Sequence, residues 1–141
     1  MEDMKTLLPH REPFLFVDRI EKATEEEIIA YRKFTESDFF FKGHFPEYPV
    51  VPGVIMVETM AQCGGAGVNR LGVLGKDALF FLATVNNAKF KRQVRPGDEV
   101  KVVVSNLRIG PKMLKQAGKA YVGDELAAEA EWMCIVGSQG T

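Results

Sequence analysis

The chain has 141 residues, with 18 basic and 19 acidic side chains and a net charge of −1 at pH 7. This length predicts one domain, residues 1–141, with a substantial core. The balanced charge excludes a general affinity for nucleic acid, and no apolar run approaches the roughly 20 residues of a membrane span. Because no secretory pattern is visible and Cys63 and Cys134 lie far apart in apolar surroundings, we expect reduced thiols and a cytoplasmic protein.

The first part of the chain has strand character. Phe14–Ile20 and Glu27–Phe34 are rich in aromatic and β-branched residues, and acidic residues connect them. A loop rich in glycine and proline follows, over residues 43–52.

One strong helix is predicted, from Gly53 to about Gly67. Pro52 precedes its start, and several glycines thin out its end. Its side chains are apolar on nearly every side, which is typical of a buried helix. The rest of the chain must therefore wrap around it.

The second half supplies further strands. Leu79–Phe90 is a long apolar run, and alternating patterns mark Val100–Ser105 and Leu126–Ile135. Gly123-Asp124 predicts a hairpin turn before the last strand. The sum is an α+β fold in which an antiparallel sheet curls around one long central helix.

His44 and Glu58 are the candidate acid–base residues. An imidazole changes protonation near neutral pH, so His44 on its stiff loop could act as a base. Glu58 lies in the apolar helix, where burial would raise its pKa and keep part of it protonated. Gln62 is four residues further on the same face and could orient Glu58. The residues alone also allow structural roles for all three.

The charge is unevenly distributed. Residues 86–119 contain nine basic side chains and two acidic ones, which indicates either a solvated sheet or a docking face for an acidic partner. No clustered cysteines and histidines at metal-ligand spacing and no glycine-rich dinucleotide motif are present, so we expect neither a metal nor a cofactor.

Five blocks of residues carry a family resemblance that covers nearly the whole chain. They are Leu8-Pro9-His10-Arg11-Glu12-Pro13-Phe14, Gly43-His44-Phe45-Pro46, Pro52-Gly53-Val54, Glu58-Thr59-Met60-Ala61-Gln62 and Phe90-Lys91-Arg92-Gln93-Val94-Arg95-Pro96-Gly97-Asp98. In order and spacing they resemble the FabZ-type (3R)-hydroxyacyl-[acyl-carrier-protein] dehydratases of type II fatty-acid synthesis. The segment Thr35-Glu36-Ser37-Asp38-Phe39 departs from the family's more usual Asn-Glu-x-x-Phe.

The resemblance implies a hot-dog fold and a homodimer with two sites at its interface, often assembled as a trimer of dimers. It places the catalytic histidine at His44 and the catalytic acid at Glu58, contributed by different subunits. Gly53 then offers an oxyanion contact, because the first helical N–H groups lack intrahelical partners, and Val54 adds an N–H or lines the pocket.

The partner implied is acyl carrier protein, which is acidic and delivers its substrate on a phosphopantetheine arm. The basic side chains after the long apolar run are the candidate docking residues: Lys89, Lys91, Arg92 and Arg95. No membrane or nucleic-acid partner is expected.

Three other functions remain open at this point. A related dehydratase also isomerises the double bond, although that branch generally has Asp where this chain has Glu58. A hot-dog thioesterase would aim water at the thioester carbonyl. An acyl-binding subunit without turnover would need neither His44 nor Glu58.

Overall fold

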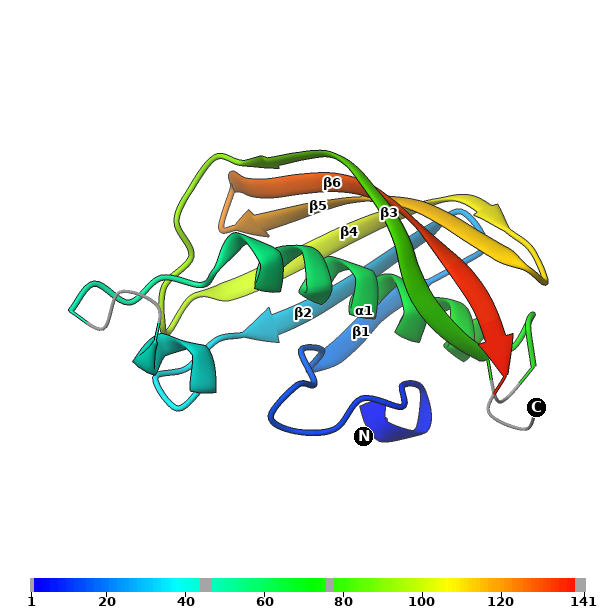
Figure 1. The fold of residues 1–141 in the computed structure, drawn as a ribbon, viewed down its shortest axis with the longest axis horizontal. Helices are drawn as coiled ribbons and strands as arrows, with labels where there is room; N and C mark the ends of the chain where they lie inside the picture. The colour runs from blue at the N-terminus through cyan, green and yellow to red at the C-terminus, as the bar shows by residue number, and fades with distance from the viewer. Residues whose placement is uncertain (1, 44–46, 76–77, 139–141) are drawn as a thin grey trace.

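The computed structural model describes residues 2–43, 47–75 and 78–138. One long helix, α1 (Gly53–Leu71), lies across the concave face of a six-stranded sheet (Figure 1). The strands are β1 (Arg19–Ala23), β2 (Glu27–Lys33), β3 (Ala78–Phe90), β4 (Glu99–Ile109), β5 (Met113–Val122) and β6 (Glu125–Ser138), and two short 3-10 turns are η1 (Met4–Thr6) and η2 (Phe39–Lys42). Among these described residues, no helix is both long and apolar enough to cross a bilayer.

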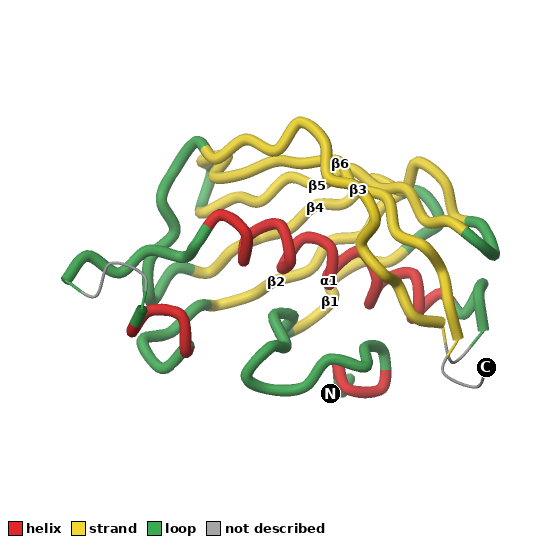
Figure 2. The backbone as a smooth tube through the Cα atoms, viewed as in Figure 1, coloured by secondary structure: helices red, strands yellow, loops and turns green. Residues whose placement is uncertain are grey.

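The sheet order is β1-β2-β4-β5-β6-β3, and every neighbouring pair is antiparallel. Strand β3 therefore pairs with the last strand of the chain and forms one edge of the sheet (Figure 2). The predicted turn between β5 and β6 is present, with Gly123 at φ 59°, a conformation that glycine adopts without steric cost. The predicted architecture, an antiparallel sheet curled around one helix, is confirmed.

The core lies between α1 and the sheet. Alternate residues of β4, β5 and β6 point toward the helix, and Val102, Leu114 and Trp132 are almost completely buried there. Gln116 is also buried in this layer, where it accepts a hydrogen bond from Trp132 (3.0 Å) and donates one to the carbonyl of Gly64 (3.2 Å). Because a buried amide without partners is costly, this arrangement fixes α1 against β5 and β6.

The helix continues past its predicted end, as far as Leu71, with Gly72 as a left-handed cap at φ 73°. The prediction of an end near Gly67 was wrong because the glycines serve close packing. A Cβ atom on Gly67 would lie 2.5–2.6 Å from the side chain of Ile28. These positions therefore bring the helix backbone directly against the sheet.

The predicted strand Phe14–Ile20 was also wrong over most of its length, since β1 begins only at Arg19. At Phe14 and Phe16 the backbone bonds to a side chain, and only from Asp18, whose N–H donates to the carbonyl of Tyr31, does it join the neighbouring strand. The N–H of Phe16 donates to Oε1 of Gln62 (2.7 Å), and Nε2 of Gln62 donates to the carbonyl of Phe14 (3.1 Å). This N-terminal segment, residues 7–16, thus lies along α1 and becomes part of the site.

Candidate active site

The carboxylate of Glu58 lies at the centre of the candidate site. The middle of α1 places it beside a cavity of about 290 Å³. Three parts of the chain line this cavity: α1 through Glu58, Ala61, Gln62 and Gly65, the N-terminal segment through Leu8, Pro9 and His10, and the sheet through Phe80, Phe81, Leu82 and Cys134. The Glu58 side chain is 24% exposed, so it faces the cavity and is not enclosed in the core.

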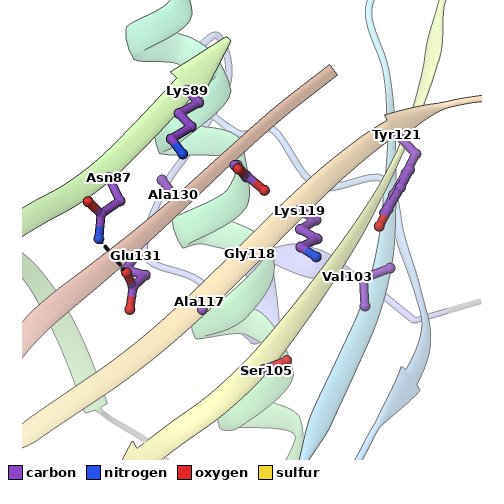
Figure 3. Close-up of a pocket in the computed structure, with 11 residues that line it drawn as sticks. Asn87, Lys89, Val103, Ser105, Ala117, Gly118, Lys119, Tyr121, Ala130 and Glu131 are labelled. Atoms are coloured by element: carbon purple, nitrogen blue, oxygen red, sulfur yellow. Dashed lines mark hydrogen bonds between the residues drawn. The ribbon is translucent and has the colours of Figure 1, made fainter. Parts of the chain in front are cut away.

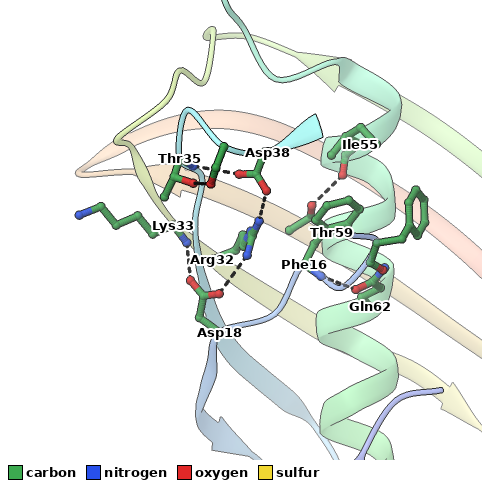
Figure 4. A network of polar contacts seen from close by, with 11 residues as sticks. Phe16, Asp18, Arg32, Lys33, Thr35, Asp38, Ile55, Thr59 and Gln62 are labelled. Carbon is green, nitrogen blue, oxygen red and sulfur yellow. Dashed lines mark hydrogen bonds and ion pairs between the residues drawn. The ribbon is translucent and has the colours of Figure 1, made fainter. Parts of the chain in front are cut away.

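Gln62 holds one oxygen of this carboxylate. Its Nε2 donates to Oε2 of Glu58 at 2.9 Å, as the four-residue spacing predicted. The orientation of the Gln62 amide follows from its other contacts, because Oε1 must accept from the N–H of Phe16 (Figure 4), which leaves Nε2 for Glu58. The hydrogen bond therefore has a fixed direction.

His10 is a site residue that the sequence did not indicate. Its Nε2 lies 3.5 Å from Oε2 of Glu58, the same oxygen that Gln62 holds, while its Nδ1 is buried without a hydrogen-bond partner in the described part of the chain. Spacing along the chain gives no sign of this contact, because a loop and a helix meet across 48 positions. Within the described residues, Oε1 of Glu58 has no recorded partner and is the oxygen available to a ligand.

Cys134 lines the same cavity from β6. Burial raises the pKa of its thiol to about 11, and the nearby negative charge of Glu58 acts in the same direction. Neither Cys134 nor Cys63 is in a disulfide, as expected. A protonated thiol in this position is an uncharged, apolar wall for the cavity.

The start of α1 forms a second hollow next to the basic segment, which is defined here as Lys89–Arg95. Gly53 and Val54 are the first helical residues, and the first helical bonds to Pro52 come from Ile55 and Met56. The hollow has a volume of about 360 Å³ and is lined by Gly53, Lys91 and Arg92 among others. Val54 is 76% exposed, so its side chain points away from the protein core.

The four candidate docking residues are only partly brought together. Lys91 and Arg92 lie beside the helix start, and Arg95 stacks over the ring of Tyr48 at 4.2 Å. Lys89 instead lines a groove on the outer face of the sheet, together with Lys119 and Glu131 (Figure 3). Acidic residues near the basic segment offset part of its charge: Arg92 lies 3.6 Å from Asp98 and 3.5 Å from Glu125, and Lys91 lies 3.9 Å from Glu129.

His44, the candidate base, lies outside the described residues. The segment that leads to it is held by a polar network around Arg32 (Figure 4). Arg32 pairs with Asp38 and, at 3.2 Å, with Asp18, while the N–H of Thr35 donates to Asp38 at 2.9 Å. This network anchors η2, which ends one residue before Gly43.

Comparisons with known proteins agree with this fold. The family model of the FabA-like domain matches residues 8–131. The 3-hydroxyacyl-[acyl-carrier-protein] dehydratase FabZ of Clostridium kluyveri is 39% identical over 141 residues, which cover 99% of this chain and 96% of the relative. That of Desulforamulus reducens is 43% identical over 138 residues, covering 96% of each.

Among solved structures, the dehydratase heterocomplex ApeI:P from Xenorhabdus doucetiae superposes with a TM-score of 0.85 at 14% identity, covering 99% of this chain and 94% of that chain. A mutant thioesterase from Pseudomonas aeruginosa superposes with a TM-score of 0.64 at 18% identity, covering 85% of this chain and 81% of that chain. At such identities these two likenesses concern the fold alone.

A helix wrapped by an antiparallel sheet, with a carboxylate facing a cavity at its middle, defines a hot-dog-fold protein of the FabA-like class. Within that class the sequence similarity extends over nearly the full length of the chain. The chain belongs to the FabZ-type 3-hydroxyacyl-[acyl-carrier-protein] dehydratase family.

Proposed function

We propose that this chain is a hydro-lyase that converts (3R)-3-hydroxyacyl-[acyl-carrier-protein] to the trans-2-enoyl product in type II fatty-acid biosynthesis. The observation that carries the proposal is the Glu58 carboxyl group, which Gln62 holds by one oxygen and which lines a cavity together with Phe80, Phe81 and Leu82. Family membership over nearly the whole chain supports the same reaction.

The elimination breaks the C2–H and C3–O bonds of the substrate and releases water. His44 is the proposed base that takes the proton from C2, and Oε1 of Glu58 is the proposed donor to the departing hydroxyl, directly or through a bound water. The proton held by His44 then returns to Glu58 to close the cycle. The role of His44 rests on its place in the Gly43-His44-Phe45-Pro46 motif.

Negative charge gathers on the thioester oxygen as the C2 proton leaves. The proposed contacts for it are the N–H groups of Gly53 and Val54 at the start of α1, where the helix dipole supplies partial positive charge. Glu58 lies five residues further along the same helix. The thioester would then lie near the helix start and the reacting carbons near its middle.

The proposed assembly is a homodimer through β3, with the histidine and glutamate of each site on different subunits. Strand β3 is a 13-residue sheet edge, and Phe81 on it is 57% exposed. A long apolar edge strand invites pairing with another strand, and a second copy of β3 offers the same surface. The exposed Val54 and Phe90 extend this apolar surface toward the helix start. A trimer of dimers is the larger assembly that the family resemblance implies.

Acyl carrier protein is the proposed partner, docking where Lys91 and Arg92 flank the hollow at the start of α1. Arg95 and Lys89 would extend this contact on either side. Such charges are expected to act mainly on the encounter rate and its salt dependence. The chain is proposed to act as one domain in the cytoplasm, where the unpaired Cys63 and Cys134 stay reduced.

The decisive experiment follows the ultraviolet absorbance of enoyl thioester during incubation with 3-hydroxybutyryl-[acyl-carrier-protein]. We expect the wild-type chain to form trans-2-enoyl product, and His44→Ala and Glu58→Gln each to lower kcat by about 10²–10⁴-fold. The matched control is Glu25→Gln, a carboxyl on the exposed turn before β2. Release of free fatty acid would instead favour a thioesterase. Formation of a cis-3 product from 3-hydroxydecanoyl-[acyl-carrier-protein] would favour an isomerising dehydratase. Wild-type turnover in Glu58→Gln would contradict the role of Glu58.

A further inference from the structure

We infer that the contact between Phe80 and Gly65 closes the far end of the substrate groove and limits the length of the acyl chain. This inference rests on the proposed function and deepens it by naming the substrate class. It follows from the walls of the cavity, from two contacts between phenylalanine rings and glycines, and from the order of groups along α1.

The cavity is a groove with α1 as its floor. One wall is the N-terminal segment, which runs along the helix so that Leu7 accepts a hydrogen bond from Asn69 (2.8 Å) and His10 lies beside Glu58. The other wall is the first part of β3, Phe80–Leu82. Two elements on either side of the helix thus enclose a channel that follows its axis.

Strand β3 contacts α1 at two glycines, one on each side of the groove beside Glu58. At the helix start, a Cβ atom on Gly53 would lie 3.0 Å from Cζ of Phe90. Three turns further on, a Cβ atom on Gly65 would lie 2.9 Å from Cδ2 of Phe80. Because both rings lie where a side chain would have been, they approach the helix as closely as its backbone allows. The groove beside Glu58 lies between these two contacts.

The order of groups along α1 gives the substrate a direction. The proposed oxyanion contacts are at residues 53 and 54, the proposed acid is at residue 58, and the cavity then continues over Ala61 to Gly65. Ala61 is small and leaves room on the helix surface, whereas Phe80 and Leu8 fill the space around Gly65. The acyl tail therefore extends from Glu58 toward the C-terminal half of the helix and ends at Phe80.

Helix geometry converts this arrangement into a chain length. Glu58 and Gly65 are seven residues apart, or about 10 Å along the axis. An extended acyl chain with C–C bonds of about 1.5 Å advances by roughly 1.3 Å per carbon, so about eight carbons fit beyond the hydroxylated one. The substrates that fit best are thus short and medium chains, up to about eleven carbons, and longer chains must displace Phe80.

The test compares Phe80→Ala and Phe80→Trp with the wild type on 3-hydroxyacyl carrier proteins from butyryl to hexadecanoyl. The measured quantity is the ratio of kcat/KM for the tetradecanoyl substrate to that for the octanoyl substrate. One methylene in an apolar pocket changes kcat/KM by about tenfold or more. We therefore expect Phe80→Ala to raise this ratio at least about tenfold and Phe80→Trp to lower the octanoyl-to-butyryl ratio. Leu107→Ala, an exposed apolar residue outside the groove, should leave both ratios unchanged.

The Gly65→Ala variant supplies a coupling test. The added methyl group must push against the Phe80 ring, so the single variant should have a lower octanoyl-to-butyryl ratio of kcat/KM than the wild type. In the Phe80→Ala background the same substitution should leave this ratio unchanged. If Phe80→Ala does not fold, Phe80→Leu takes its place. If folded Phe80→Trp and Phe80→Leu keep the wild-type ratios, the inference about chain length is wrong, while the proposed function still holds. Absence of enoyl product from the wild type at every chain length would overturn the proposed function and this inference together.

Discussion

The two oxygens of the Glu58 carboxylate have different surroundings. Oε2 accepts from Gln62 and lies near His10, whereas Oε1 has no hydrogen bond to any described residue, and Glu58 lines the cavity. A carboxyl group fixed by one oxygen presents the other in a constant direction, which is what proton transfer to a substrate hydroxyl requires. Gln62 in turn is held by the backbone of Phe14 and Phe16. The N-terminal segment therefore orients the acid of the site, although it lies far from Glu58 in the sequence.

His10→Ala should lower the activity by weakening this hold on Oε2. An ion pair between partly exposed groups contributes about 0.2–1 kcal/mol, so we expect kcat to fall by about two- to fivefold while KM changes little. His10→Gln, which keeps an N–H donor of similar reach, should recover part of the loss. Steady-state kinetics on 3-hydroxybutyryl-[acyl-carrier-protein] measure both parameters. An unchanged kcat in His10→Ala would show that Gln62 alone fixes the carboxylate.

Cys134 makes the stability of the fold sensitive to alkaline pH. Its pKa is about 11 in the folded chain against 9.0 for an unperturbed thiol, so between these values the unfolded chain loses a proton that the folded chain keeps. This contribution is complete below pH 9 and is lost as the pH rises toward 11. Denaturant unfolding at pH 8 and pH 10.5 should show a smaller alkaline loss of stability in Cys134→Ala than in the wild type, and an equal loss would contradict this assignment.

Helix α1 is the element that positions the site, and its glycines set its distance from the sheet. The apolar run and the preceding Pro52 identified the helix and its start, but the same glycines that place its backbone against Ile28, Phe80 and Gln116 made its end appear too early. A glycine that ends a helix and a glycine that permits close packing are identical in sequence. Only the facing strands distinguish them. The Arg32 network could not be predicted from the sequence for the same reason. Its partners Asp18 and Asp38 look like ordinary surface residues until the strands are paired.

Gly67→Ala should destabilise the fold. The added methyl would lie within 2.6 Å of three carbons of Ile28, a buried and branched side chain with little freedom to move. Overpacking of this kind costs about 1–3 kcal/mol, which the better helix propensity of alanine, at about 1 kcal/mol, offsets only in part. Thermal unfolding should show a lower Tm. Gly43→Ala is the control, since no atom of the described residues lies within 4 Å of that Cβ position and its φ is −109°. Equal Tm values for the two variants would contradict the packing argument.

At the scale of the whole molecule, patterns in the sequence predicted the layers but not the pairing between distant segments. Alternation located β4 and β6, and the helix was evident from its apolar run. The place of β3 beside β6 at the sheet edge depends on which strands meet, and local periodicity carries no such information. For the same reason the basic segment looked more strongly charged than it is, because its acidic partners Glu125 and Glu129 come from another strand.

The proposed dimer has a consequence that a single subunit could not show. If each site takes His44 from one subunit and Glu58 from the other, the His44→Ala and Glu58→Gln homodimers both lack any complete site. Subunit exchange between them gives heterodimers in which one site has both native residues and the other has neither. With random mixing, half of the dimers are of this kind, so about one quarter of wild-type activity should return.

The experiment dissociates and reassociates an equimolar mixture of the two variants and follows dehydration of 3-hydroxybutyryl-[acyl-carrier-protein] with time. The control mixes each variant with itself, which should give no recovery. If both residues of a site belonged to the same subunit, every site in the heterodimer would carry one substitution. Activity would then stay at the level of the separate variants.

A second experiment places Phe81→Lys on the exposed edge of β3, where the added charges of two paired strands repel each other. Light scattering should show a monomer, and dehydration should be lost with the dimer.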